Sequence, residues 1–160
     1  AAVATNNVIG INNTLPWKLS KDLQNFKKIT EGQVVVMGTN TFKSLGNKPL
    51  KKRTNVILTT KPINDVDDDL VYKINSFEEA QLLFAYREYI YVIGGASVYQ
   101  HVFDNHEVEK ILLTVIHENF EGDSYFPDVD FGKYNVISST TDEENGLMFS
   151  FVELQLKQDE

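Results

Sequence analysis

The sequence contains no cysteine, and its three histidines, His101, His106 and His117, are not spaced with acidic residues in an HExxH-type pattern. Without cysteine, neither disulfides nor thiolate metal sites can form, which fits a reducing compartment. We therefore expect no bound metal. Long apolar runs are also missing, because no segment approaches the about 18 apolar residues of a membrane helix and no charged-then-apolar leader opens the chain. We expect a cytoplasmic protein without a membrane partner.

Positive charge is scarce in this chain. Lys and Arg number 15 against 23 for Asp and Glu, which gives a formal net charge of −8. A surface that binds nucleic acid or an anionic membrane needs a basic face, so we expect neither partner. Any phosphate group must be bound locally, by backbone N–H groups, hydroxyls and one or two lysines.

The 160 residues, of which 42% are hydrophobic, suffice for one domain with a core and are too few for two ordinary domains. We expect a single domain over residues 1–160. Short β-branched runs alternate with amphipathic stretches, which predicts an α/β fold with a central, mostly parallel twisted sheet flanked by helices. The predicted strands are 2–5, 34–37, 55–59, 70–74, 90–93 and 110–117, and the predicted helices are 21–29, 41–44, 77–86 and 97–103.

Two local signals refine this assignment. Ser76 and Glu79 have the spacing of a capping box, and Ser20 is expected to cap the first helix. The last third of the chain alternates apolar and polar residues over 134–139 and 147–156, with turn residues at 143–146. This pattern predicts a C-terminal antiparallel hairpin at the sheet edge.

One acidic residue, Asp22, lies on the apolar stripe of the first predicted helix. The apolar positions recur at helical spacing, at Leu19, Leu23, Phe26 and Ile29. A carboxylate on this stripe points inward and needs a partner that donates hydrogen bonds, and the N–C–N edge of a ring ligand offers two donors in matching geometry. In isolation, the commoner interpretation is an acid that faces water and stabilises the helix dipole.

Three further residues are candidates for a site. Trp17, the only tryptophan, ends a polar loop over residues 12–17, and it suits either a core position or donation to a water beside the inward acid. Thr114 is the lone hydroxyl of an apolar strand, where threonine is usually structural. Arg53 precedes a predicted strand and is a candidate to bind a substrate carboxylate, although most such arginines are solvated.

Three predicted strands run directly into glycine, hydroxyl or amide residues, in the segments 34–41, 57–62 and 91–99. In parallel sheets, ligands bind at these carboxyl ends. Helices after Gly38 and Gly95 offer free N–H groups to phosphates, and Thr59, Thr60 and Lys61 add hydroxyls and a cation. Together these ends favour an extended phosphorylated ligand such as a dinucleotide. The chain lacks GxGxxG and GxxxxGKS/T, so neither a Rossmann fingerprint nor an NTPase loop is inferred.

An ordered set of motifs resembles dihydrofolate reductases of the short bacterial or phage kind. The motifs are Val8-Ile9-Gly10, Leu15-Pro16-Trp17, Asp22-Leu23-x-x-Phe26, Val36-Met37-Gly38-x-x-Thr41-Phe42-x-Ser44, Arg53-x-Asn55, Ile93-Gly94-Gly95-x-x-x-Tyr99 and Glu121-Gly122-Asp123-x-x-Phe126-Pro127. They span nearly the whole chain, in order and with close spacing. The resemblance implies a monomeric enzyme that reduces 7,8-dihydrofolate with NADPH and binds antifolate-like small molecules.

For the substrate, the resemblance implies that Asp22 binds the pterin 2-amino group and N3 with help from Thr114. Trp17 would contact a water near the acid, Arg53 would pair with the glutamate carboxylate of the substrate, and Lys27 would assist at the rim. The other implied substrate contacts are Ala2, Leu23, Phe26, Leu45 and Ile93.

For NADPH, the resemblance implies Ala2, Ile9 and Tyr99 near the nicotinamide, and a cis peptide bond between Gly94 and Gly95. The other implied cofactor contacts are Gly38, Asn40 and Thr41 at a phosphate, Leu58, Thr59, Thr60 and Lys61 around the adenosine half, and Gly94, Gly95, Ala96, Ser97, Val98 and Tyr99 along the pyrophosphate. Thr39 is uncharged where many relatives place an arginine against the 2′-phosphate, and Ser97 is uncharged where some relatives carry another. Lys61, with Thr59 and Thr60, is the replacement that the chain offers.

Two other functions remain open. A pyrimidine reductase of riboflavin synthesis shares the implied fold but needs neither the Leu-Pro-Trp loop nor an inward acid. A non-catalytic binder of folates or dinucleotides would have the same pocket without productive geometry.

Overall fold

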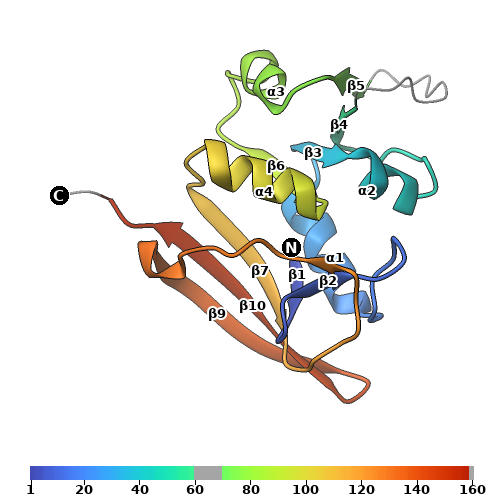
Figure 1. Cartoon of the computed structure of the whole chain (residues 1–160), viewed down its shortest axis with the longest axis vertical. Coiled ribbons are helices and arrows are strands. Elements are labelled where there is room, and N and C mark those ends of the chain that lie inside the picture. Colours follow the sequence, from blue (N-terminus) through green and yellow to red (C-terminus); the bar gives the residue numbers. More distant parts are fainter. Residues whose placement is uncertain (60–69, 159–160) are drawn as a thin grey trace. The chain divides into compact units, whose positions relative to one another are not determined.

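The computed structural model describes residues 1–59 and 70–158 (Figure 1). The chain divides into two compact units. Unit 1 consists of Ala1–Asp22 and Tyr99–Glu160, and unit 2 consists of Leu23–Val98. The single domain expected from the length of the chain stays a prediction.

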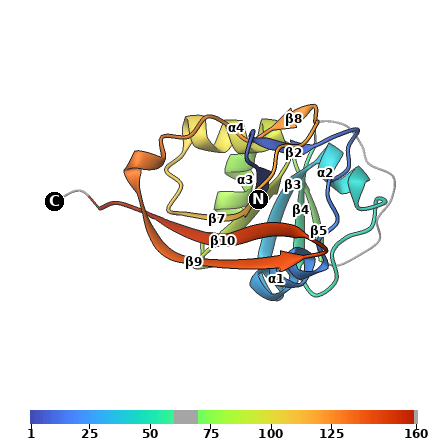
Figure 2. The same ribbon diagram turned by 90° about the horizontal axis from the view of Figure 1, so that it is seen from below.

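Unit 1 is built on a four-stranded sheet with the order β1-β7-β10-β9. β1 (Ala2–Ala4) pairs in parallel with β7 (Lys110–Ile116), and β7 pairs antiparallel with β10 (Leu147–Leu156). β9 (Tyr134–Glu144) runs antiparallel beside β10 at the edge of the sheet (Figure 2). The predicted C-terminal hairpin is therefore confirmed.

The turn of this hairpin is tighter than the sequence pattern predicts. The expected turn covered residues 143–146, but β9 continues to Glu144, and only Asn145 and Gly146 connect the two strands. Their φ values are 53° and 81°. An Asn-Gly pair adopts this left-handed backbone readily, so the turn needs only two residues and the acidic residues before it belong to the strand.

Unit 1 also contains a two-stranded ribbon that the sequence patterns do not predict. β2 (Val8–Gly10) pairs antiparallel with β8 (Ser124–Tyr125). Both strands are too short to produce a readable alternation. Gly122, just before β8, lies close to β2, because a Cβ atom at this position would overlap Val8 Cγ1 and lie 2.6 Å from the Gly10 carbonyl oxygen.

Unit 2 contains a parallel sheet with the order β5-β4-β3-β6. Its strands are β3 (Val34–Gly38), β4 (Thr54–Leu58), β5 (Val71–Ile74) and β6 (Ile90–Gly94). All three pairings are parallel, as the sequence predicts. Every residue of the central strand β3 is buried, which explains its continuous apolar run.

All four predicted helices are present, with shifted ends. They are α1 (Ser20–Thr30), α2 (Thr39–Ser44), α3 (Phe77–Leu83) and α4 (Ala96–Asn105), and a short 3-10 helix, η1 (Phe131–Lys133), was not predicted. α1 begins in unit 1 and continues into unit 2, whereas α4 runs from unit 2 into unit 1. No helix within residues 1–59 and 70–158 has both the length and the apolar character to cross a membrane.

Both helix caps expected from the sequence are wrong in detail. Ser76 stands at the N-cap of α3, but its side chain makes no capping hydrogen bond, and Glu79 accepts from the Asn75 N–H at 3.4 Å instead. The Ser20 hydroxyl at the start of α1 donates to Glu144 at 3.0 Å. A side-chain oxygen that donates to a carboxylate is not acting as the acceptor that a cap requires.

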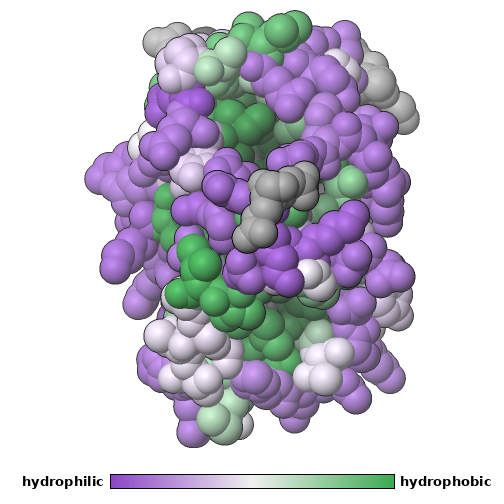
Figure 3. Space-filling view, turned by 90° about the vertical axis from the view of Figure 1, so that its left-hand side faces the viewer, coloured by the Kyte–Doolittle hydropathy of each residue, from purple (hydrophilic) through white to green (hydrophobic). Residues whose placement is uncertain are grey.

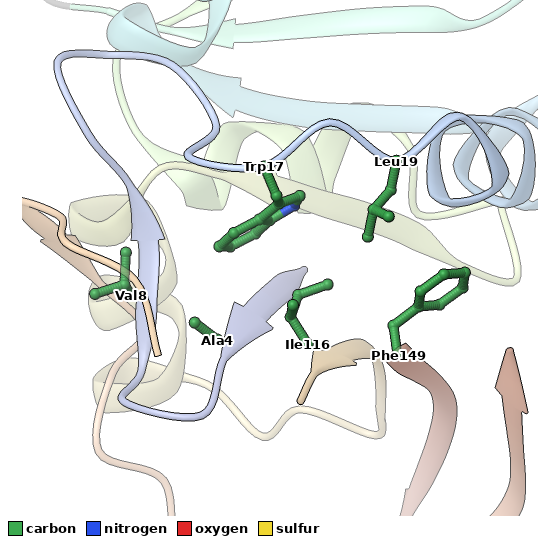
Figure 4. Packing of buried hydrophobic residues seen from close by; sticks show 6 residues of the cluster. All are labelled: Ala4, Val8, Trp17, Leu19, Ile116 and Phe149. Carbon is green, nitrogen blue, oxygen red and sulfur yellow. The ribbon is translucent and has the colours of Figure 1, made fainter. Parts of the chain in front are cut away.

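Each unit has its own apolar core. In unit 1, six buried residues form one cluster, namely Ala4, Val8, Trp17, Leu19, Ile116 and Phe149 (Figure 4). In unit 2, the cluster consists of Val35, Met37, Phe42 and Ile57. Apolar surface also interrupts the mostly hydrophilic face in Figure 3. The large apolar side chains left exposed include Leu82, Tyr86 and Val136.

We expect Gly122→Ala to lower the melting temperature by several degrees. The added methyl group would force β2 and β8 apart, and overpacking of this kind costs about 1–3 kcal/mol. In a protein of this size, each kcal/mol corresponds to roughly 2–4 °C in Tm. Thermal unfolding followed by circular dichroism measures the effect. Gly132→Ala is the control, because the nearest atom to its Cβ is the end of the Asp130 side chain at 3.1 Å. Equal melting temperatures for the two variants would contradict the predicted clash.

Candidate functional site

In unit 1, the structure brings Asp22 and Thr114 together. Asp22 lies in the first turn of α1, and Thr114 is buried in β7. The Thr114 hydroxyl donates to Asp22 Oδ1 at 2.6 Å, although the two residues are 92 positions apart in the sequence. The strand register sets the position of this hydroxyl, because Thr114 pairs with Ala2 on one side and with Phe151 on the other.

The Asp22 carboxylate is half-buried and only partly satisfied. Burial raises its pKa above the ordinary value, and the hydrogen bond from Thr114 offsets part of that rise. Within the described part of the chain, Thr114 is its only hydrogen-bond partner. Oδ2 can therefore accept from a ligand, and a carboxylate with one committed oxygen is suited to a pair of parallel donors.

Trp17 is a core residue with an unsatisfied polar atom. Its side chain is 7% exposed, and its ring lies 5.2 Å from the ring of Phe120 in an edge-on arrangement. The indole Nε1 is buried and has no hydrogen-bond partner among the described residues. A buried N–H without a partner is costly, so this atom can donate to a water or a ligand.

The loop that leads to Trp17 is attached to the segment before β8. The Asn12 N–H donates to Asp123 Oδ2 at 3.0 Å, and the Asp123 N–H donates to the Gly10 carbonyl at 3.0 Å. Asn12 and Asn13 both adopt positive φ angles, 48° and 61°. Asparagine tolerates this conformation, which explains the Asn-Asn pair at the bend.

Tyr99, on α4, is another buried side chain of unit 1 that the resemblance implies. Its ring lies 5.4 Å from that of Phe126. Burial raises the pKa of its hydroxyl, so the side chain stays neutral at physiological pH. Ala2 and Ile9, the other nicotinamide contacts that the resemblance implies, are half-buried in β1 and β2.

In unit 2, the predicted phosphate-binding residues gather where β3 and β6 end. A Cβ atom on Gly38 would lie 3.0 Å from Val98 Cγ2, and one on Gly95 would lie 3.6 Å from Thr41 Oγ1. The peptide bond between Gly94 and Gly95 is cis, as predicted. Parallel strands bring their carboxyl ends to the same edge of a sheet, so segments distant in sequence meet here.

The end of β4 belongs to the same edge of the sheet. The Thr39 hydroxyl donates to the Leu58 carbonyl at 3.3 Å and so links the start of α2 to β4. Thr59 is buried, whereas Asn40 and Ser97 are exposed. Thr60 and Lys61 lie outside the described residues.

Arg53 is held from two directions in unit 2. Its Nε donates to the Lys51 carbonyl at 2.8 Å, and its Nη1 donates to the Thr30 hydroxyl at 3.2 Å. Its guanidinium carbon lies 6.0 Å from the centre of the Phe26 ring. Nη2 has no hydrogen bond within residues 1–59 and 70–158. Sequence reasoning missed Thr30, whose only signal is a hydroxyl at the end of an otherwise amphipathic helix.

One expected pattern on α1 is wrong. The apolar stripe was predicted to include Leu23, but this side chain is 56% exposed. Adjacent residues on a helix differ in direction by about 100°. Asp22 and Leu23 therefore point in different directions from the helix axis, and the half-buried positions that follow on α1 are Phe26 and Ile29. The other implied substrate contacts differ in burial, since Leu45 and Ile93 contact the unit 2 core cluster and Lys27 is exposed.

Comparisons with known proteins agree with one another. A family model described as "Dihydrofolate reductase" matches residues 1–156. The chain is 36% identical over 159 residues to a dihydrofolate reductase of Bacillus subtilis (strain 168), covering 98% of this chain and 92% of the relative. It is also 36% identical over 150 residues to one of Staphylococcus aureus, covering 92% and 89%.

The same agreement extends to a solved structure. A dihydrofolate reductase from Enterococcus faecalis, complexed with NADP(H) and RAB-propyl, superimposes with a TM-score of 0.83 at 30% sequence identity. The superposition covers 98% of this chain and 94% of that chain.

We expect Asp22→Asn to stabilise the ligand-free protein by an amount that increases with pH. Because burial raises the pKa of Asp22, the folded state holds the proton more tightly than the unfolded chain does. Below the ordinary value of 3.8 both states are protonated. As the pH rises above it, the unfolded chain releases the proton more readily than the folded parent protein does, so the parent loses stability until the pH passes the raised pKa of the folded state. Thermal melts of both proteins from about pH 4 to 8 measure the difference. A difference in Tm that does not change with pH would refute this assignment.

Proposed function

The chain belongs to the dihydrofolate reductase family, and from this membership we propose that it reduces 7,8-dihydrofolate to 5,6,7,8-tetrahydrofolate by hydride transfer from NADPH. The observation that carries the proposal is the half-buried Asp22 carboxylate, held by Thr114 with one oxygen uncommitted. A carboxylate in this state is suited to a neutral or cationic ring that presents two N–H donors, and a pterin presents such an edge.

Asp22 anchors the substrate ring. Its oxygens accept from the pterin 2-amino group and N3, and the Thr114 hydroxyl fixes the rotation of the carboxylate. Charge-assisted paired hydrogen bonds are stronger than neutral ones and define an orientation. The anchor therefore presents one face of the ring for reaction, which is the positional part of catalysis.

The proton that the pterin N5 gains arrives through water in this mechanism. Asp22 binds the opposite edge of the ring, so its role is to orient the ring and to favour a polarised or protonated form. The buried, unpartnered Nε1 of Trp17 is suited to hold a water near the Asp22 carboxylate. The loop over residues 12–17 excludes bulk solvent from the reacting faces.

The cofactor supplies the hydride, and the residues at the strand ends of unit 2 fit its phosphates. The first N–H groups of α4, a ten-residue helix, have no intrahelical partners, and the adjacent Thr41 and Ser97 add hydroxyls. Gly95 leaves the backbone open to close approach. Tyr99, neutral because it is buried, is proposed to contact the nicotinamide with Ala2 and Ile9. Contacts from Thr60 and Lys61 to the adenosine half stay predictions.

Arg53 is proposed to bind the glutamate carboxylate of the substrate. Its Nε and Nη1 are held by unit 2 itself, which fixes the guanidinium plane, and its Nη2 is available. A preorganised guanidinium loses little freedom when it binds a carboxylate. Lys27, Leu23, Phe26, Leu45 and Ile93 are the further proposed contacts, and antifolate-like small molecules would compete for Asp22.

We expect Asp22→Asn to reduce turnover of dihydrofolate at neutral pH by at least about 100-fold while NADPH affinity changes little. The asparagine retains the shape of the side chain but not the charge that pairs with the ring. The assay follows NADPH absorbance after addition of dihydrofolate. A variant as fast as its parent would disprove the role of Asp22.

The same assay on the parent protein separates the proposed function from its alternatives. Oxidation of NADPH supports the reductase, and binding of dihydrofolate without oxidation supports a non-catalytic binder. No response to dihydrofolate would instead favour the pyrimidine reductase.

For Arg53→Lys we expect the KM for dihydrofolate to rise about 10-fold or more with kcat nearly unchanged. Lysine cannot form the paired hydrogen bonds, and a lost hydrogen bond to a charged group costs about 1.5–3 kcal/mol. Arg53 does not touch the reacting atoms, so its binding energy is the same in the ground and transition states. The control is a dihydropterin substrate without the glutamate, for which parent and variant should have equal KM. An equal loss with both substrates would show that the effect is structural.

A further inference from the structure

The N-terminus of α1 is capped by a residue from the far end of the chain. The Ser20 N–H donates to Glu144 Oε2 at 2.8 Å, and the Lys21 N–H donates to Glu144 Oε1 at 2.9 Å. The first N–H groups of a helix have no intrahelical partner and are usually capped by a nearby side chain. Here one carboxylate satisfies two of them from 124 positions away, and it accepts the Ser20 hydroxyl as well.

The geometry of the hairpin places Glu144 at this helix end. Glu144 is the last residue of β9 and pairs with Leu147 across the two-residue turn (Figure 2). Leu147 contacts the same core cluster that contains Leu19, the residue directly before α1. Apolar packing therefore brings the hairpin tip and the helix start together, and the carboxylate forms the polar part of the same junction.

Neighbouring charges reinforce the junction. The Lys21 ammonium donates to Asp142 Oδ1 at 2.9 Å and to the Glu143 carbonyl at 3.1 Å. The hydrogen bonds from the Lys21 and Ser20 N–H groups lower the pKa of Glu144, so it is ionised at neutral pH. An anion at this position also interacts favourably with the positive end of the helix dipole.

We propose that Glu144 is a positioning residue for Asp22. Asp22 directly follows Lys21, whose N–H the Glu144 carboxylate holds, and its own carboxylate is fixed by Thr114 on β7. The first turn of α1, which carries Asp22, therefore contacts one sheet at two points. Its backbone donates to Glu144 of β9, and the Asp22 side chain accepts from Thr114 of β7. This role rests on the proposed function, because it concerns how accurately Asp22 meets the substrate ring.

The variants to compare are Glu144→Ala and Glu144→Gln, with Glu143→Gln as the matched control. Glu143 is exposed, its carboxylate has no partner in the described part of the chain, and its substitution removes the same charge one residue away. We expect Glu144→Ala to raise the KM and Kd for dihydrofolate by up to about 30-fold, because the free energy that a helix loses with its cap sets the upper limit of the effect on binding. The Kd for NADPH should stay within about twofold.

Glu144→Gln keeps one oxygen for the helix N–H groups, so it should recover part of the affinity for dihydrofolate and provides a folded variant if the alanine variant unfolds. Hydrogen exchange gives a readout independent of turnover, and the N–H groups of Ser20 and Lys21 should exchange faster in Glu144→Ala than in Glu143→Gln. Glu144 variants that lower the Tm but match Glu143→Gln in KM would overturn the positioning role. A parent protein that does not oxidise NADPH with dihydrofolate would instead overturn the proposed function, and the positioning role with it.

Discussion

The register of β7 is the constraint on which the rest of unit 1 depends. β7 pairs with β1 on one side and with β10 on the other, so its position fixes three strands at once. A shift by one residue would turn Thr114 to the opposite face of the sheet and leave Asp22 without its donor. The same pairing holds β10 in place and, through the hairpin, the carboxylate at the start of α1. The register of the strands therefore determines the geometry of the site.

The candidate site contains buried polar groups that lack hydrogen-bond partners among the described residues, which is unfavourable. Asp22 is a half-buried acid with one donor, and Trp17 Nε1 is the buried side-chain polar atom left without a partner in the described part of the chain. Elsewhere in unit 1, buried polar side chains such as Ser150 have partners. Unsatisfied groups of this kind are tolerated where a ligand relieves them, and ligand binding then adds to the stability of the fold.

The sequence predicted the elements whose signal is local. Continuous apolar runs gave β3 and the other parallel strands, because strands buried on both faces have this composition. β2 and β8 were missed because alternation of apolar and polar residues can be recognised only over about four or more residues, and these strands have three and two. Leu23 was misassigned because a stripe drawn through spacing alone ignores that its neighbour Asp22 occupies the inward direction.

The parts of the candidate site that depend on tertiary structure were harder to predict. The contact between Asp22 and Thr114 was expected only from the family resemblance, since nothing local connects residues 92 positions apart. No sequence signal linked Thr30 to Arg53 or Glu144 to Ser20. The Glu144 cap also depends on a turn of two residues, whereas the composition suggested four.

That short turn has a consequence for protein engineering. An exposed Asn-Gly tip is the kind of site normally chosen for an inserted epitope, a fluorescent label or new chain termini. Here the turn length determines which face of β9 each residue occupies, and one extra residue before Asn145 would exchange Glu144 with its neighbour. An insertion at this tip therefore preserves the cap on α1 only if the register of β9 with β10 is kept. Exposure alone does not identify where such an insertion can be made.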